Sequence, residues 1–338
     1  MRSVLLRGSD AVTCVDVAAP DPGPGEVVIR TRVSAICGSE LKGYRGAGAA
    51  TGNSGHEAAG VVERLGPGVT SLREGERVGV SAVVGCGDCC CCERGQYTWC
   101  RNRRMYSSMH AEQFVTQAHA CRPLPDDLPW AVGVLITGDG FGVPYHTNTK
   151  IPGQTGSVAI FGMGPVGLGN ALMQSSLGRR VIAIDVAPRR LELARELGAA
   201  EAVQATGTVD VVAAVRDLTA GAGADVCIEA AGRPETAAQC FRAVRTAGTV
   251  VFNGEQPAVE LSPSEDFIRR DITAVGSWFY HFGEFDDMLQ LYRDGLAVDR
   301  LITHRLALEE AAEGYRLMAA GESGKVLLEM GTAAGGSG

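Results

Sequence analysis

One short segment carries four cysteines at spacings that suit a metal ion. Gaps of two, two and seven residues separate Cys86, Cys89, Cys92 and Cys100. Four thiolates can surround one zinc ion tetrahedrally when short gaps let the chain fold back around it, and such a site has no open position for substrate. The neighbours Cys90 and Cys91 could exchange with these ligands, but the gap of seven residues favours Cys92. We therefore expect a structural zinc site in the loop 86–100, with a metal-free cysteine-rich turn as the alternative.

A glycine-rich run has the spacing of a dinucleotide-binding loop. Gly162-Met-Gly164-Pro165-Val166-Gly167 follows the apolar run 158–161 and opens a predicted helix that continues through Gln174. This is the strand–turn–helix context that the pattern requires. The first glycine makes the tight turn, the second lets the backbone approach a pyrophosphate, and the third lets helix and strand pack closely. The helix N-terminus then offers free N–H groups to the phosphates. A glycine-rich turn without a cofactor is the alternative.

The next predicted strand, 181–184, indicates which dinucleotide is bound. It is followed by Asp185, where a carboxylate can accept hydrogen bonds from the ribose hydroxyls of NAD and would repel the 2′-phosphate of NADP. Arg189 and Arg190 follow shortly and could instead hold a phosphate, but Arg190 is equally able to lie along the adenosine edge of NAD. We expect NAD.

Two further segments carry residues that could ligate a metal. Cys37 lies in Ile36-Cys37-Gly38-Ser39-Glu40, and His56-Glu57 follows Gly55. Alone, a cysteine after a strand is usually a small core residue, and a single histidine is usually a hydrogen-bonded one. Only the combination with the two motifs above favours a metal centre.

The elements that must position these residues change character along the chain. Up to about residue 130, short strands such as 26–33 and 60–64 alternate with Gly- and Pro-containing turns, which predicts a compact β-barrel or sandwich. From about residue 150, strands alternate with helices: 189–197 is a predicted helix, 224–229 a strand, 234–244 a helix and 248–252 a strand. This rhythm predicts a doubly wound parallel sheet. A helix near 284–294 and a strand at 324–328 are expected to return to the first domain, and the tail 333–338 to be disordered.

Composition excludes several classes of function. A net charge of −8 argues against nucleic acid or an anionic membrane as the main partner. We expect the basic run 101–104 to be a solvated turn. No apolar run reaches membrane-spanning length, and residues 1–8 suit a first strand better than a signal peptide. Because there are 11 cysteines and no export signal, we expect metal ligands rather than disulfides, and a cytoplasmic location.

In this chain order, Cys37, His56-Glu57, the four-cysteine loop and the glycine-rich run resemble the medium-chain zinc alcohol dehydrogenases. That family includes secondary-alcohol, sorbitol and threonine dehydrogenases. The resemblance extends from the turn at 23–26 to the strand at 324–326. It implies an α/β protein with a GroES-like β-barrel catalytic domain, residues 1–145 and 277–338, and a Rossmann NAD-binding domain, residues 146–276. It also implies a homodimer or homotetramer.

The resemblance further implies a catalytic zinc, making two zinc ions per chain. Cys37 and His56 are the first two ligands, with Glu57 as a nearby carboxylate and occasional fourth ligand. The third ligand lies just before the nucleotide domain, where Asp139 is the only good candidate in the segment 135–142; its alternative role is to cap the following helix. Zinc with three protein ligands keeps one position for an alcohol oxygen, whose pKa it lowers.

The resemblance assigns four more residues. Ser39 matches the hydroxyl that hydrogen-bonds the substrate oxygen, and Glu40 is expected to brace the site. Lys42 stands where several relatives carry a proton-relaying histidine. Only three lysines occur among the 31 basic residues, and lysine, unlike arginine, can release its proton. Lys325 matches a late basic residue that reaches the pyrophosphate; a solvated lysine at a strand end is the alternative.

These residues predict hydride transfer between NAD and a secondary alcohol or ketone, with a polyol, sugar, cyclitol or amino alcohol as substrate. A zinc-free enone or quinone reductase of the same superfamily is one alternative. It has no use for Cys37, His56, Glu57 and Asp139 together. A non-enzymatic nucleotide-sensing protein is another, but it would tolerate loss of Ser39 or of the Cys37/His56 pair.

Overall fold

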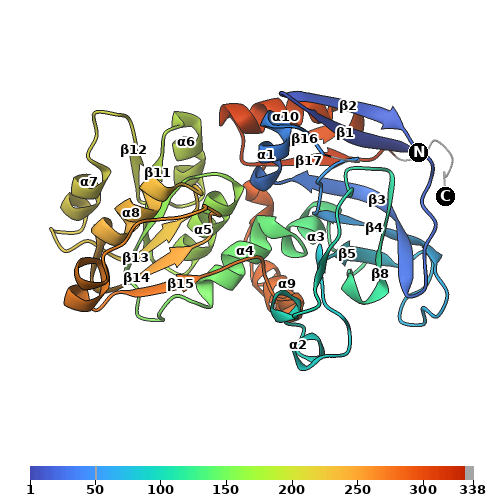
Figure 1. Cartoon of the computed structure of the whole chain (residues 1–338), viewed down its shortest axis with the longest axis horizontal. Coiled ribbons are helices and arrows are strands. Elements are labelled where there is room, and N and C mark those ends of the chain that lie inside the picture. The colour runs from blue at the N-terminus through green and yellow to red at the C-terminus, as the bar shows by residue number, and fades with distance from the viewer. Residues whose placement is uncertain (50–51, 332–338) are drawn as a thin grey trace. The chain divides into compact units, whose positions relative to one another are not determined.

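The computed structural model describes residues 1–49 and 52–331, so the expected disorder of the tail 333–338 concerns residues outside this range. Two compact units are present: Met1–Gly142 with His281–Gly338, and Val143–Tyr280 (Figure 1). The first boundary falls inside helix α4, Asp139–Asn148. Within the described residues no helix is long and apolar enough to cross a membrane.

Unit 1 is built on a seven-stranded sheet in the order β16-β17-β3-β4-β5-β9, with β8 also paired to β3. Its strands are β1 Arg2–Gly8, β2 Ala11–Asp16, β3 Glu26–Ile36, β4 Ala58–Leu65, β5 Arg77–Val80, β6 Val83–Val84, β7 Arg104–Met105, β8 Gln113–Gln117, β9 Cys121–Pro123, β16 Ile302–Ala307 and β17 Lys325–Glu329. Its helices are α1 Leu41–Arg45, α2 Cys90–Glu93, α3 Trp130–Ile136, α9 Phe285–Arg293 and α10 Ala311–Ala320.

Strand β3 organises this sheet, because three strands pair with it. β4 lies along one edge, β8 pairs with residues 26–30 and β17 with residues 33–36 of the other edge, all antiparallel. The pairing with β17 brings the C-terminal segment back to the N-terminal sheet.

Helix α10 packs beside β1, β2 and β17 (Figure 1). Its side chains Ala311, Tyr315 and Met318 share an apolar core with Val4 and Leu6 of β1, Ile36 of β3, and Val326 and Leu328 of β17. Each of these side chains is nearly or fully buried. Burial of this apolar surface stabilises the packing of α10 on the strands that lead to Cys37.

Unit 2 is a six-stranded parallel sheet in the order β12-β11-β10-β13-β14-β15. The strands are β10 Ser157–Phe161, β11 Arg180–Asp185, β12 Glu201–Gln204, β13 Ala224–Glu229, β14 Val244–Phe252 and β15 Thr273–Gly276. The helices are α5 Pro165–Ser176, α6 Pro188–Glu196, α7 Val211–Leu218 and α8 Pro234–Ala243. The strand order reverses between β10 and β13, which is where a doubly wound sheet binds its ligand. The expected fold class is confirmed.

Candidate active site

Two loops of unit 1 meet because β3 and β4 are antiparallel neighbours. Ser34 of β3 lies opposite Ala58 of β4, and the amide of Ala35 donates to the carbonyl of Glu57 at 3.0 Å. Cys37 lies just beyond the end of β3, and His56 just before the start of β4. The sheet register therefore places the thiol and the imidazole side by side.

Asp139, the first residue of α4, completes this cluster. Its Oδ2 lies 3.1 Å from Nε2 of His56 and 3.6 Å from Sγ of Cys37. One ligand atom from each of Cys37, His56, Glu57 and Asp139 lies within 4.8 Å of all the others. The predicted set thus comes together from three segments that are far apart in sequence.

The cluster fits a metal ion by its own chemistry. Oδ1 of Asp139 is buried, and no hydrogen-bond partner is found for it in the described part of the chain. A buried carboxylate oxygen without a partner is costly, and a cation supplies what it lacks. His56 binds the carbonyl of Ser54 through Nδ1 at 2.9 Å, which leaves Nε2 to face the cluster. A sulfur, a nitrogen and a carboxylate oxygen are a ligand set that zinc accepts.

The charges around His56 favour a cation. Burial opposes a charge on the imidazole, but the Cys37 thiol and the Asp139 carboxylate outweigh it and raise the pKa of His56 well above its ordinary value. The same negatively charged groups attract a metal ion. The metal ion competes with protons for the ligand atoms of Cys37, His56 and Asp139.

Glu57, directly before β4, has partners for both of its carboxylate oxygens. Its Oε1 pairs with Nζ of Lys325, and its Oε2 accepts a hydrogen bond from the amide of Gly140 at 3.1 Å. Burial raises the pKa of Glu57, although the ammonium opposes this effect. Burial also disfavours the charge on Lys325, but Glu57 outweighs it and raises the pKa of that ammonium. The Lys325 ammonium is thus the main group that favours the ionised form of Glu57, and the Glu57 carboxylate is the main group that favours the charged form of Lys325.

The position of Lys325 differs from the sequence expectation. The alternative of a solvated lysine at a strand end is wrong, because the residue is only 1% exposed and its ammonium lies on Glu57. A Cβ on Gly138 would lie 2.6 Å from the carbonyl oxygen of Val134 and 2.7 Å from Oε2 of Glu57, so both groups exclude a side chain at this position. A contact between Lys325 and a pyrophosphate stays a prediction.

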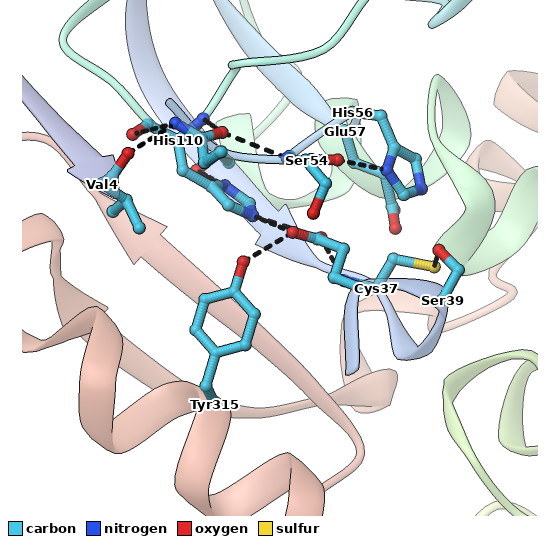
Figure 2. Close-up of polar contacts among 12 residues, drawn as sticks. Val4, Cys37, Ser39, Ser54, His56, Glu57, His110 and Tyr315 are labelled. Atoms are coloured by element: carbon cyan, nitrogen blue, oxygen red, sulfur yellow. Dashed lines mark hydrogen bonds and ion pairs between the residues drawn. The ribbon is translucent and has the colours of Figure 1, made fainter. Parts of the chain in front are cut away.

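Ser39 and Lys42 follow Cys37 closely. The Ser39 hydroxyl is exposed and lies 3.3 Å from Sγ of Cys37, at the edge of the cluster (Figure 2). Lys42 is exposed on α1. The hydroxyl is therefore near enough to the ligand atoms to meet a bound substrate oxygen.

Glu40 is buried behind the cluster with partners that the sequence did not indicate. Its carboxylate accepts hydrogen bonds from the amide of Cys37 at 2.9 Å, from Nε2 of His110 at 3.1 Å and from the hydroxyl of Tyr315 at 2.6 Å (Figure 2). Burial alone would raise the pKa of Glu40, but His110 and the other partners lower it to about 2. His110 and Tyr315 stand in no recognisable motif, so no local signal could have identified them.

The four-cysteine loop folds as predicted by its spacing. The Sγ atoms of Cys86, Cys89, Cys92 and Cys100 all lie within 4.8 Å of one another, whereas Cys90 is exposed. The amide of Cys92 lowers the pKa of Cys89 to about 7, while the Asp88 carboxylate raises that of Cys86 to about 12. Metal binding at this loop must therefore displace the proton that Cys86 shares with Asp88.

In unit 2 the glycine-rich loop joins β10 to α5. A Cβ on Gly167 would lie 1.9 Å from the carbonyl oxygen of Gly162, so only glycine allows the helix to start this close to the turn. A Cβ on Gly164 would meet nothing within 4 Å. The open space there, beside the helix N-terminus at Pro165 and Val166, is a cradle that suits a phosphate group.

Asp185 ends β11 beside this loop. Its carboxylate accepts hydrogen bonds from the amides of Met163 at 2.5 Å and Ala187 at 2.8 Å. Arg189 pairs with Glu192 and Glu196 along the surface of α6, at 3.0 and 3.5 Å. Its guanidinium is thus engaged by carboxylates rather than held ready for a phosphate. Arg190 is half-buried on the same helix.

Comparisons with known proteins identify both regions. Residues 23–126 match the alcohol dehydrogenase GroES-like domain, and residues 165–294 match the zinc-binding dehydrogenase family. L-threonine 3-dehydrogenase of Pyrococcus horikoshii is 34% identical over 328 residues, which cover 93% of this chain and 93% of the relative.

Solved structures agree over nearly the whole length. Alcohol dehydrogenase TADH from Thermus sp. ATN1 is 30% identical with a TM-score of 0.86, covering 98% of this chain and 100% of that one. The 2R,3R-butanediol dehydrogenase from Bacillus subtilis is 25% identical with a TM-score of 0.82, covering 97% and 99%. The resemblance expected from the motifs is confirmed: the chain belongs to the zinc-dependent alcohol dehydrogenases of the medium-chain type and is an oxidoreductase that acts on alcohols.

Proposed function

We propose that this chain transfers hydride between NAD and a secondary alcohol or the matching ketone. One observation carries the proposal: Cys37, His56 and Asp139 converge on one point, with the Ser39 hydroxyl 3.3 Å from the Cys37 sulfur. A zinc ion held there supplies a Lewis acid for an alcohol oxygen, and NAD supplies the hydride acceptor.

The protein's own residues would do the remaining work. Both oxygens of Glu57 are engaged, by Lys325 and by the Gly140 amide. Cys37, His56 and Asp139 would therefore hold the zinc ion, and three protein ligands would leave it able to take a substrate oxygen. Ser39 would hold the substrate oxygen and accept its proton while giving up its own hydroxyl proton. Lys42, which is exposed on α1, would take up that proton as a neutral amine and release it to water.

The substrate class rests on two relatives. L-threonine 3-dehydrogenase and 2R,3R-butanediol dehydrogenase are both named for substrates that carry a secondary hydroxyl next to a second polar group. We propose that this chain acts on such a hydroxyl in a polyol, sugar, cyclitol or amino alcohol. A zinc-free enone or quinone reductase is disfavoured, because it would leave the unpartnered Oδ1 of buried Asp139 without purpose.

NAD is the proposed cofactor because the carboxylate of Asp185, at the end of the strand that follows the glycine-rich loop, would repel a 2′-phosphate, and Arg189 pairs with Glu192. The pyrophosphate would be held by the glycine-rich loop, residues Gly162, Gly164, Pro165, Val166 and Gly167, with Arg190 on the adenosine edge. A contact between Lys325 and the pyrophosphate stays a prediction. We further propose residues 1–145 with 277–338 as the catalytic domain and 146–276 as the NAD-binding domain.

A homo-oligomer in the cytoplasm is the proposed state. Strand β15 ends the sheet of unit 2 and is largely exposed, so its edge is one place where a second copy could pair. Light scattering on the purified protein would decide between a dimer and a tetramer, and a monomer would contradict this part of the proposal.

The test of function is an assay of NAD reduction, followed by absorbance, with threonine, 2,3-butanediol, polyols and cyclitols. Ser39→Ala should lower kcat about 10²–10⁴-fold, the usual effect of losing a proton-transfer group, whereas Ser39→Thr should retain most activity. NADP should support the reaction poorly. Asp185→Asn should lower the ratio of activity with NAD to activity with NADP. Activity that is unchanged in Ser39→Ala and equal with both cofactors would refute these assignments.

A further inference from the structure

His110 lies between the two loops that carry Cys37 and His56. It belongs to the segment that precedes β8, its side chain is fully buried, and nothing in the proposed reaction uses it. Figure 2 shows the imidazole between the Val4 strand on one side and the Cys37 loop on the other. A buried imidazole with several specific partners must be placed by its surroundings and can in turn place them.

The first connection runs from His110 to Cys37 through Glu40. Nε2 of His110 donates to both carboxylate oxygens of Glu40, at 3.1 and 3.2 Å, and Nδ1 lies 2.8 Å from the hydroxyl of Ser34. Oε1 of Glu40 also accepts from the amide of Cys37 at 2.9 Å. The peptide that carries the thiol is thereby tied to the imidazole by two consecutive hydrogen bonds.

Tyr315 steadies the same carboxylate from α10. Its hydroxyl donates to Oε2 of Glu40 at 2.6 Å, and its ring meets the imidazole of His110 edge to face at 6.3 Å. Tyr315 is 0% exposed and belongs to the apolar core shared by α10, β1 and β17. The carboxylate of Glu40 is therefore held in place relative to the apolar core that contains Tyr315.

The second connection runs from His110 to the His56 loop. Oδ1 of Asn53 accepts from the amides of His110 and Gly55, at 3.2 and 3.1 Å, and Nδ2 of Asn53 donates to the carbonyl of His110. The imidazole itself packs on Gly55: a Cβ at that position would lie 2.6 Å from Cγ and Cδ2 of His110. The residue directly before His56 is thus a glycine because the ring of His110 occupies the space.

We propose that His110 is a positioning residue that fixes the separation of the Cys37 and His56 ligand atoms, by holding Glu40 on one loop and packing on Gly55 of the other. The proposal rests on the proposed zinc-dependent function of the same cluster. His110 touches neither ligand atom. It acts through Glu40 and Tyr315 on the Cys37 peptide, and through Gly55 on the His56 peptide.

Metal affinity of the resting protein tests this role without any substrate. His110→Phe keeps a ring against Gly55 but removes both hydrogen bonds, whereas His110→Gln can still donate toward Glu40. Losing such a supporting contact typically weakens metal binding 10–100-fold. We expect a loss of this size for His110→Phe in competition between the protein and a chromophoric chelator for Zn²⁺, at the catalytic site only. His110→Gln should recover most of it.

Cobalt provides a readout of ligand geometry. With Co²⁺ in the catalytic site, the thiolate charge-transfer and ligand-field absorption should shift in His110→Phe and return toward the wild-type spectrum in His110→Gln. Tyr315→Phe removes a single hydrogen bond to Glu40 and should show a smaller loss of Zn²⁺ affinity with a spectral shift in the same direction. It keeps the proposal testable if His110→Phe does not fold.

A matched control separates positioning from stability. Leu328→Ala removes a fully buried side chain from the same core of unit 1, and this side chain makes none of the hydrogen bonds that hold Glu40 and His110. It should lower the melting temperature while leaving Zn²⁺ affinity and the Co²⁺ spectrum unchanged. The proposal is overturned if His110→Phe binds Zn²⁺ with wild-type affinity and spectrum, or if Leu328→Ala loses the metal to the same extent.

Cys37→Ala distinguishes failure of the proposed function from failure of the positioning role of His110. If it does not lower the zinc content, the proposed function itself fails. If it removes one zinc ion while the variants at His110 and Tyr315 bind normally, only the positioning role fails. Gly55→Ala should also weaken Zn²⁺ binding, because its methyl group would lie 2.6 Å from the ring of His110. Equal affinity of Gly55→Ala and wild type would contradict the packing half of the proposal.

Discussion

The buried dyad of Glu57 and Lys325 makes a quantitative prediction. In Lys325→Met the Glu57 carboxylate, which is 0% exposed, keeps the hydrogen bond from the Gly140 amide and no other from the described residues. Breaking a buried ion pair by removing one partner costs about 3–5 kcal/mol, because an uncompensated charge is left behind. We expect a loss of this size in the free energy of unfolding at neutral pH, and a much smaller one when Glu57→Gln is combined with Lys325→Met.

The pH dependence of this loss follows from Glu57. Its pKa is raised in the folded protein, mainly by burial, and without the ammonium it should rise further. The folded state then binds a proton more tightly than the unfolded state, so the penalty grows as the pH rises through the folded pKa. It should vanish as the pH falls below the unfolded value of 4.5.

Urea unfolding followed by tryptophan fluorescence measures these energies, since Trp99 and Trp130 both lie in unit 1. Lys42→Met is the matched control: it is the same change in the same unit at an exposed lysine, and should stay within about 0.5 kcal/mol of wild type. A Lys325→Met protein within about 1 kcal/mol of wild type would refute the argument. So would additive effects of the Glu57 and Lys325 variants, because interacting residues must show coupling.

Two further predictions concern unit 2. Gly164→Ala should leave the melting temperature unchanged but weaken NAD binding measured by calorimetry, because its methyl group would enter the open space beside the helix N-terminus. Gly167→Ala should lower the melting temperature of unit 2, because its methyl group would meet the carbonyl oxygen of Gly162. The reverse ranking would contradict the assigned roles. Asp225 accepts hydrogen bonds from Ser157 and Arg245, which lower its pKa below 3.8 against the effect of burial. Asp225→Asn should therefore lose about 1–3 kcal/mol in the free energy of unfolding, measured in urea above pH 3.8, and the loss should shrink at lower pH. A loss that grows on acidification would contradict this prediction.

The parts of the site that were predictable are contiguous in sequence. The four-cysteine loop and the glycine-rich loop each depend on spacing within a short segment, and short segments fold locally. Cys37 and His56 were identified only through their order among these motifs. What joins them in space is the antiparallel pairing of β3 with β4, which each strand's own residues do not specify.

The partners behind the ligands were not predictable for the same reason. Tyr315 reaches Glu40 across 275 positions of sequence, and Lys325 reaches Glu57 across 268. Lys325 lies at the start of a strand, where a lysine is usually solvated, yet the fold buries it against Glu57. His110 had no neighbouring residue that suggested a role. Tertiary packing decides these contacts.

Among the elements, the strongly apolar strands of unit 2 were predicted and several short ones were not. β12 and β15 have four residues each and are mostly half-buried or exposed, so they lack an apolar run. α7 begins with Val-Val-Ala-Ala-Val, a run that suits a strand as well as a helix. The packing of its Val211 and Val215 on the sheet selects the helix.

Zinc content per chain tests the central claim most directly. The purified protein and its Cys37→Ala variant should be measured by elemental analysis beside Cys37→Ser, which keeps a similar volume and replaces the thiolate with a poor ligand. Two zinc ions per chain in the wild type, one in each variant and a retained fold in all three are the predicted result. One zinc ion that persists unchanged in Cys37→Ala, with no second ion taken up from added zinc, would show that Cys37, His56 and Asp139 form no metal centre and would contradict the proposed reaction.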